Sequence, residues 1–299
     1  MLSFLPSIII FPLHLLLQVI NLSFWGGIII AMGFIKLLLP FQFTTRILNP
    51  VMGQFSILFG VCSVLIIKLT NRIEWDFKIK GELGKDKWYL MMPNHLSWLD
   101  IILLFDFASG RIPAPKFFLK KELIWVPFVG LGAWALDMPF MQRYSRAFLD
   151  KYPHLKGKDI ETTKKSCEKF KNTPVTVINF VEGTRYTMDK HKLKNSPFAS
   201  LLPPKAGGAA FTLAAMGELF SNILDVTILY PNNTKRPMLD MLSGRLNKVV
   251  LHVDVLPVTE DVVGDYFNNE DFRKRFQAWL NGVWESKDKL ITQLMSSKQ

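Results

Sequence analysis

Cysteine is scarce in this sequence, and the short motifs of several large enzyme classes are absent. The 299 residues include two cysteines, Cys62 and Cys167, which are too few for a disulfide framework and lack the C-x-x-C spacing of zinc and redox sites. The chain contains no G-x-S-x-G, H-E-x-x-H or G-x-x-x-x-G-K segment. These absences disfavour a serine hydrolase with a nucleophile elbow, a zincin and a P-loop enzyme, and the few cysteines fit a reducing compartment.

Charged side chains are missing from the start of the chain. Residues 1–35 contain no Lys, Arg, Asp or Glu, and a helix that spans a bilayer needs about 20 apolar residues. The stretch lacks the basic beginning and the small-residue cleavage pattern of a removable signal peptide, so we expect it to be retained. The sequence therefore predicts one transmembrane helix over about residues 7–38.

A second uncharged run extends from Ile47 to Ile67, and basic residues flank it at Arg46 and Lys68. This run could span the bilayer, or it could lie in the interface as a helix over about residues 47–69. The basic flanks favour the interfacial arrangement, because both flanks then stay on one side of the membrane. The positive charge that follows the first apolar run predicts that this side is the cytoplasm.

The composition changes near residue 74 to short apolar runs separated by Gly, Pro and charged residues. We therefore divide the chain into a hydrophobic membrane anchor, residues 1–72, and a cytoplasmic domain, residues 73–299. Strands are expected at residues 88–92, 175–181, 226–229 and 249–255, and helices at residues 98–107, 207–216 and 271–295. The last helix is amphipathic and is expected to pack on the domain. This alternation predicts an α/β fold in which helices flank a central, mostly parallel or mixed sheet.

The charge balance is strongly basic, with 36 Lys and Arg against 25 Asp and Glu and a formal net charge of +11. Such a surface attracts phosphate, either on lipid headgroups or on nucleic acid. The basic residues are dispersed along the chain without a recognised nucleic-acid-binding motif, so nucleic acid is disfavoured as a partner. Charge and anchor together indicate the membrane bilayer as a partner.

The first candidate for chemistry is NHLSWLD, residues 94–100, in which His95 and Asp100 are five positions apart. On one continuous helix these two side chains would point about 140° apart, at about 100° per residue. His95 is therefore expected on the turn before the helix, folded back onto it. In that geometry Asp100 accepts a hydrogen bond from one imidazole nitrogen and leaves the other nitrogen free to remove a proton.

The same spacing occurs a second time in HLKGKD, where His154 precedes Asp159. This segment is rich in lysine and no apolar strand precedes it, so we interpret it as a solvated loop. A structural role for His95, satisfied by hydrogen bonds inside the fold, is the open alternative to catalysis.

The second candidate is FVEGTRYT, residues 180–187, in which a predicted strand leads into Gly183 and Arg185. Glycine allows the backbone to approach a ligand closely, and the arginine fork matches phosphate oxygens. These residues together suggest an anion site. The alternative, a tight turn with a solvent-exposed arginine, stays open at this point.

The chain contains an apolar anchor, then NHLSWLD, then FVEGTR. In this order the segments resemble the glycerolipid acyltransferase family, which includes lysophosphatidic acid acyltransferases and carries H-x-x-x-x-D and E-G-T-R motifs. FLKKELIWVPFVG, residues 118–130, and LPPKAGGAAFTLA, residues 202–214, are similar to further segments of that family. The resemblance covers most of residues 88–231. The VEGTRYT, LPPK and DVTILY segments most resemble an inner-membrane branch of Gram-negative bacteria.

The resemblance implies a role for particular residues of this chain. It makes His95 the general base and Asp100 the residue that orients it. It assigns substrate binding, chiefly at the acceptor's phosphate, to Lys120, Glu182, Gly183, Thr184, Arg185 and Lys205. The chain departs from the family at Val181, where proline is frequent, and at Gln142, where an acid is usual, so the role of Arg143 stays open.

The function that the resemblance implies is transfer of a fatty acyl group to the free hydroxyl of lysophosphatidic acid, which yields phosphatidic acid. The donor would be acyl-CoA or acyl carrier protein, and no metal or bound cofactor is implied. The implied location is the bacterial inner membrane, with the catalytic domain facing the cytoplasm. Two alternatives stay open: a lysophospholipid-remodelling acyltransferase that acts on lysophosphatidylglycerol or a similar acceptor, and a non-catalytic basic membrane scaffold.

Overall fold

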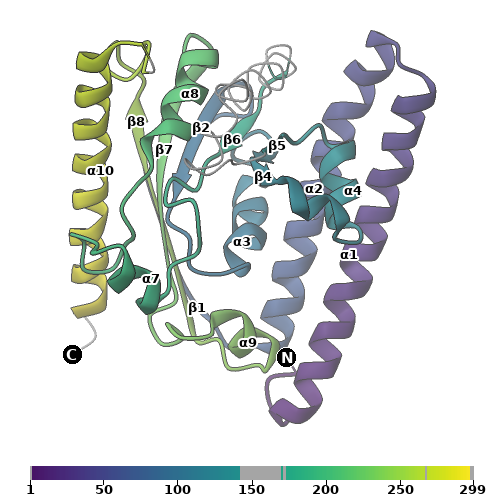
Figure 1. The fold of residues 1–299 in the computed structure, drawn as a ribbon. Helices are drawn as coiled ribbons and strands as arrows, with labels where there is room; N and C mark the ends of the chain where they lie inside the picture. The colour runs from purple at the N-terminus through teal and green to yellow at the C-terminus, as the bar shows by residue number, and fades with distance from the viewer. Residues whose placement is uncertain (1, 142–169, 171–172, 267, 297–299) are drawn as a thin grey trace.

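The computed structural model describes residues 2–141, 170, 173–266 and 268–296. Two long N-terminal helices form an antiparallel hairpin beside an α/β domain (Figure 1). The hairpin consists of α1, Ser7–Leu38, and α2, Gln42–Thr70. Both helices were expected from the sequence, although α2 begins before the predicted residue 47.

Each hairpin helix is long and apolar enough to cross a membrane. The most apolar window of α1 is 17% buried within the protein, whereas that of α2 is 44% buried, so α1 is the outer helix of the pair. Large apolar side chains of α1, including Leu16, Ile20 and Phe24, are exposed. These apolar helices suggest that the protein associates with a membrane.

Polar side chains join the two hairpin helices along their contact. Asn21 Nδ2 donates a hydrogen bond to Ser63 Oγ at 2.8 Å, and Thr70 Oγ1 lies 2.7 Å from His14 Nδ1. Interhelical bonds of this kind are typical of helices packed in apolar surroundings. They fix how the two helices are aligned along their length.

The outer helix also contacts the α/β domain near both of its ends. Ile10 packs against Gly244, and Lys36 forms an ion pair of 2.6 Å with Asp137. About 39 Å of helix separates Ile10 from Lys36, at 1.5 Å per residue, and a bilayer core is about 30 Å thick. The domain therefore contacts α1 near both of its ends, and the crossing of the bilayer by α1 stays a prediction.

The domain is built on a six-stranded sheet with the order β1-β8-β7-β2-β6-β3. The β7–β8 pair is antiparallel and the other neighbouring pairs are parallel, as expected for a mostly parallel or mixed sheet. The strands are β1, Glu74–Lys80; β2, Trp88–Pro93; β3, Pro115–Phe117; β6, Thr176–Ile178; β7, Phe220–Leu229; and β8, Lys248–Pro257. The strand predicted at 175–181 is thus shorter, because residues 179–181 already begin a loop.

Side chains of β2 alternate between two hydrophobic cores. Tyr89 and Met91 face the core shared with α2 and α3, whereas Leu90 and Met92 face the core shared with α8 and α10. These helices are α3, Leu99–Ala108; α8, Ala206–Met216; and α10, Glu270–Ser296. Figure 1 shows α3 on one face of the sheet and α10 on the other. The predicted α/β fold with flanking helices is confirmed.

Short elements complete the described domain. A two-stranded sheet pairs β4, Leu119–Lys120, with β5, Phe140–Met141. The 3-10 helix η1, Lys121–Trp125, leads to α4, Val129–Ala135, which packs on α1. The remaining helices are α7, Met188–Leu193, and α9, Pro237–Leu242.

Candidate active site

Asn94 fixes the start of the loop that carries His95. Its side chain donates to Ile228 O at 2.9 Å and accepts from Ile228 N at 2.8 Å, so the amide continues the β2–β7 pairing beyond Pro93. Asn94 is fully buried, where an unpaired amide would be costly. The loop therefore leaves β2 in a defined direction.

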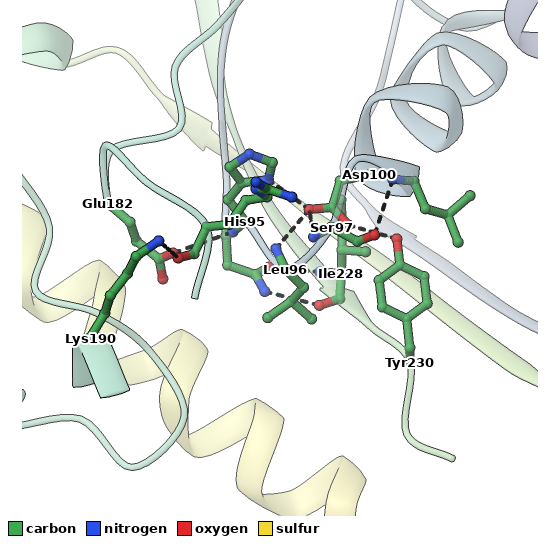
Figure 2. Close-up of polar contacts among 11 residues, drawn as sticks. His95, Leu96, Ser97, Asp100, Glu182, Lys190, Ile228 and Tyr230 are labelled. Carbon is green, nitrogen blue, oxygen red and sulfur yellow. Dashed lines mark hydrogen bonds and ion pairs between the residues drawn. The ribbon is translucent and has the colours of Figure 1, made fainter. Parts of the chain in front are cut away.

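Asp100 lies in the first turn of α3 and holds this loop together. Its Oδ2 accepts hydrogen bonds from Leu96 N at 2.7 Å and Ser97 N at 2.9 Å. The same oxygen lies 2.8 Å from His95 Nδ1. The structure thus confirms the predicted contact, in which His95 precedes the helix and folds back onto it (Figure 2).

Tyr230 is a member of this cluster that sequence reasoning missed. It follows β7 directly, and its hydroxyl donates to Asp100 Oδ1 at 2.6 Å. Burial, and then the charge of Asp100, raises the pKa of Tyr230 well above its ordinary value. The hydroxyl therefore keeps its proton and donates a hydrogen bond to Asp100. The DVTILY segment shows that a tyrosine follows this strand, but its alignment with Asp100 depends on how the strands pair.

The imidazole of His95 is enclosed but reachable. Its side chain is 13% exposed, and its ring stacks on Phe180 with the centroids 4.0 Å apart. With Nδ1 directed at Asp100, Nε2 is the nitrogen left for a substrate, and none of the described residues forms a hydrogen bond with it. This is the geometry of a general base with an orienting carboxylate.

Glu182 lies on the other side of His95, where it is completely buried. Its Oε2 accepts from His95 N at 3.4 Å, and its Oε1 accepts from Leu202 N at 3.2 Å. Burial raises the pKa of Glu182 to about 8, against the opposing effect of these two backbone N–H groups. Its carboxyl oxygens face the protein backbone, so its position does not support the expected contact with the acceptor's phosphate.

The residues after Glu182 form a basic loop next to His95. Gly183 has a φ of +70°, a left-handed conformation that favours glycine. Arg185 is exposed, and its guanidinium carbon lies 4.9 Å from the centre of the Trp98 ring. Tyr186 N donates to His95 O at 2.7 Å, which joins this loop to the His95 loop. The residues predicted to form an anion site therefore lie beside the candidate base, and anion binding by them stays a prediction.

Lys190 is a further cation at this loop that the sequence did not single out. Its Nζ donates to Thr184 Oγ1 at 2.9 Å and to Arg185 O at 3.1 Å. The exposed Lys205 is also adjacent, because its backbone N donates to Val181 O at 2.7 Å. The side chain of Lys190 and the exposed residue Lys205 thus lie next to Arg185 of the E-G-T-R turn.

The other predicted site residues have different outcomes. Lys120 ends β4, and the expected contact of its side chain with substrate stays a prediction. Arg143 and the His154–Asp159 pair lie outside the described residues. A separate pair, His252 and Asp76, has its Nε2 and Oδ1 atoms 3.0 Å apart where β8 meets β1.

Two other features of the described residues do not add to the site. They contain no group of three or more His, Cys, Asp or Glu side chains that could hold a metal ion. A cavity of about 200 Å³, lined by Gln54, Ala114 and Lys116 among others, lies at the β3 and β6 ends where these strands begin. His95 lies beyond the opposite end of the parallel strand β2, so the chemistry is centred elsewhere.

Residues 76–230, more than half of the chain, match the family model described as Acyltransferase. This segment contains both His95 and the E-G-T-R turn. The chain therefore belongs to this acyltransferase family.

Relatives and a solved structure agree with this assignment. The chain is 25% identical over 271 residues to the rat 1-acyl-sn-glycerol-3-phosphate acyltransferase delta. The aligned region covers 83% of this chain and 66% of that protein. It is 30% identical over 198 residues to the Saccharomyces cerevisiae 1-acyl-sn-glycerol-3-phosphate acyltransferase, covering 64% of this chain and 56% of the relative. It thus spans less than two thirds of the length of these relatives.

The fold is similar to the crystal structure of the 1-acyl-sn-glycerophosphate (LPA) acyltransferase PlsC from Thermotoga maritima. The TM-score is 0.57 at 18% identity, and the match covers 94% of this chain and 96% of that one. At this identity the likeness establishes the fold, including the N-terminal helical part.

Proposed function

We propose that this protein transfers a fatty acyl group from acyl-CoA or acyl carrier protein to the free hydroxyl of lysophosphatidic acid, forming phosphatidic acid. The observation that carries the proposal is the His95–Asp100 contact of 2.8 Å beside a basic turn. The family and the names of the relatives support the reaction class and the acceptor. The reaction requires neither a metal nor a bound cofactor.

In the proposed step, His95 Nε2 removes the proton of the acceptor hydroxyl while that oxygen attacks the thioester carbonyl. Asp100 keeps the proton on Nδ1 and compensates the positive charge that develops on the ring. Collapse of the tetrahedral intermediate breaks the carbon–sulfur bond, and His95 returns its proton to the leaving thiolate. No acyl-enzyme forms, which is consistent with the absence of a nucleophile elbow.

The acceptor's phosphate is proposed to bind Arg185, with Lys190 and Lys205 adding positive charge around the turn. Thr184 and Gly183 shape this turn. Buried Glu182, by contrast, is proposed to hold the loop through its backbone partners. The phosphate would then sit next to the base, which places the acceptor hydroxyl within its reach.

The proposed location is the inner membrane of a bacterium, with the domain on the cytoplasmic side. The exposed apolar face of α1 and the net charge of +11 support contact with an anionic bilayer. Acceptor and product are both lipids, so a site at the membrane surface spares their acyl chains from entering water.

The test is acyl transfer from a labelled thioester to lysophosphatidic acid by wild type, His95→Ala and His252→Ala at equal expression. Loss of a general base is expected to lower kcat by about 10²–10⁴-fold in His95→Ala. His252→Ala removes the other described His–Asp pair and is expected to keep activity. Equal loss in both variants, or full activity of His95→Ala, would contradict the assignment.

The same assay separates the alternative acceptors. Lysophosphatidic acid and lysophosphatidylglycerol are offered together, and the labelled products are resolved. A preference for lysophosphatidylglycerol would indicate a remodelling enzyme. A wild-type protein that turns over no lysophospholipid but binds anionic vesicles would indicate the scaffold.

A further inference from the structure

The terminal helix α10 places a buried lysine against the strand ends that carry the site. Lys287 is 1% exposed, although lysine is almost never fully buried unless it is paired. Its Nζ donates to Met92 O at 3.0 Å and to Val226 O at 2.5 Å. The same atom forms an ion pair of 2.8 Å with Asp225 Oδ1. One amino group therefore joins the end of β2 to β7.

Burial and the acceptors around this amino group act on its charged form in opposite directions, and its pKa is lowered overall. Burial lowers the pKa of Lys287, while Asp225 and then Glu182 and Asp254 act in the opposite direction. Three acceptor atoms surround Nζ, and an ammonium has three N–H groups whereas a neutral amine has two. A neutral amine would leave one buried acceptor facing its lone pair, which is costly.

The contacts of Lys287 lie next to the candidate base along the chain. Met92 is three residues before His95, and Val226 O also accepts the backbone N–H of Asn94 at 3.4 Å. One carbonyl thus receives hydrogen bonds from both Lys287 and Asn94. The spacing of β2 and β7, at the point where the His95 loop leaves the sheet, depends on this ammonium.

The charge of Lys287 also reaches the second loop of the site. It lowers the pKa of buried Glu182, while the charge of Asp100 raises it. Burial and then the charge of Glu182 raise the pKa of Tyr186, and the charge of Glu182 opposes the lowering of the Lys194 pKa by burial and by Lys205. Burial raises the pKa of Glu182 to about 8, and Lys287 opposes this by favouring the ionised carboxylate, the better acceptor for the two backbone N–H groups that join the loops.

We propose that Lys287 is a positioning residue for acyl transfer, which fixes the His95 loop through Met92 and Val226 and keeps Glu182 bonded to it. This inference rests on the proposed function. Lys287 lies outside residues 76–230, the segment that the family model matches. The reaction centre thus depends on a charge supplied by the terminal helix.

The test compares full-length Lys287→Met, Lys287→Arg and the double variant Lys287→Met/Asp225→Asn with wild type. The double variant removes both charges of the ion pair, so it leaves no buried charge unpaired and is expected to fold better than Lys287→Met. Lys289→Met, at an exposed position of the same helix, is the matched control. Thermal unfolding, kcat, KM and the pH profile of kcat are measured for each variant with lysophosphatidic acid.

In the folded double variant, kcat is expected to fall about 10- to 100-fold, because a small displacement of the base is sufficient for such a loss. The KM of the acceptor should change little. Loss of the positive charge at Lys287 raises the pKa of Glu182, so the acid limb of the pH profile should move to higher pH. Lys287→Arg is expected to recover part of the activity, and Lys289→Met should equal wild type.

The inference is overturned if the folded double variant keeps the kcat and the pH profile of wild type, since Lys287 would then serve stability alone. A change confined to KM would overturn it too. Absence of lysophosphatidic acid turnover by wild type would instead contradict the proposed function. The rate at which diethyl pyrocarbonate modifies His95, followed by mass spectrometry across pH, then tests the positioning role without a substrate.

Discussion

At the scale of single residues, the candidate site is organised around one carboxyl group. Asp100 is fully buried, and its oxygens receive donors from Leu96, Ser97, Tyr230 and the His95 ring. These hydrogen bonds compensate for the cost of burying the carboxyl group and hold it in one position. The His95 ring is held by its contact with this carboxyl group. The direction of His95 Nε2 is therefore set by residues that do not touch the substrate.

Replacing Tyr230 by phenylalanine is expected to lower kcat about tenfold, equivalent to about 1.4 kcal/mol in the barrier. The change removes one donor from Asp100 and leaves the ring of residue 230 in place. Steady-state kinetics with both substrates measure the effect. Tyr89→Phe is the control, because Tyr89 is an equally buried tyrosine whose hydroxyl accepts a hydrogen bond from Gly84. Equal kcat values for the two variants would contradict a role for Tyr230 at the site.

Arg185→Ala is expected to raise the KM of the lysophospholipid acceptor about tenfold or more and to leave the KM of the thioester donor nearly unchanged. The guanidinium is exposed beside His95 and matches phosphate oxygens. Initial rates at varied concentrations of each substrate separate the two constants. Lys192→Ala, an exposed lysine on α7, serves as the control. An equal rise in both constants would count against Arg185 as a phosphate ligand.

At the scale of elements, the site forms where three neighbouring parallel strands end. His95 follows β2, Glu182 follows β6, and Tyr230 follows β7. The carboxyl ends of parallel strands lie at the same edge of a sheet, which is where ligand sites of α/β folds form. Helix α3 then presents Asp100 to that edge, and its position depends on α2 behind it.

Close packing of α2 on α3 makes Gly60 sensitive to substitution. A methyl group there would overlap Phe105 Cβ and approach Asp106 N to 2.8 Å. Gly60→Ala is expected to destabilise the protein by about 1–3 kcal/mol, since extra volume forces the helices apart. Gly27→Ala, where nothing lies within 4 Å, should have no cost or a gain of about 1 kcal/mol. Thermal unfolding in detergent compares the two variants with wild type. Equal unfolding midpoints would contradict close packing of α2 on α3.

The elements were largely predictable from hydrophobic patterns, with instructive exceptions. The patterns located β2, α3, α8, β8 and α10. Strand β1 was missed, although Trp75, Phe77 and Ile79 alternate with charged residues, which is a pattern typical of a strand. A short strand such as β6 has too few residues for its apolar run to mark where it ends and the site loop begins.

At the scale of the whole molecule, the hairpin lies against the domain and directs an apolar face outward. Domain contacts at Ile10 and Lys36 lie near the two ends of α1. If α1 stood upright through a bilayer, these contacts would draw the charged domain into the hydrocarbon core. We therefore expect α1 to lie side-on in one leaflet, with residues such as Leu16 and Ile20 in the lipid.

Cysteine labelling in sealed vesicles tests this arrangement. In a background without Cys62 and Cys167, single cysteines replace Ser3 and Gln42, which flank α1. A membrane-impermeant maleimide should modify both positions from the same side, because neither end crosses the bilayer. Modification of the two positions from opposite sides would instead support the transmembrane helix expected from the sequence.

The sequence by itself determined those features that depend on neighbours along the chain. Apolar runs predicted the hairpin helices. The place of His95 on the turn between a predicted strand and the helix that carries Asp100 predicted the contact of these two residues. Only the tertiary structure decided the burial of Glu182 and the approach of Tyr230 and Lys287, because β7 and α10 are distant in sequence from the residues they support. Their contacts depend on strand order and helix packing, which no local pattern encodes.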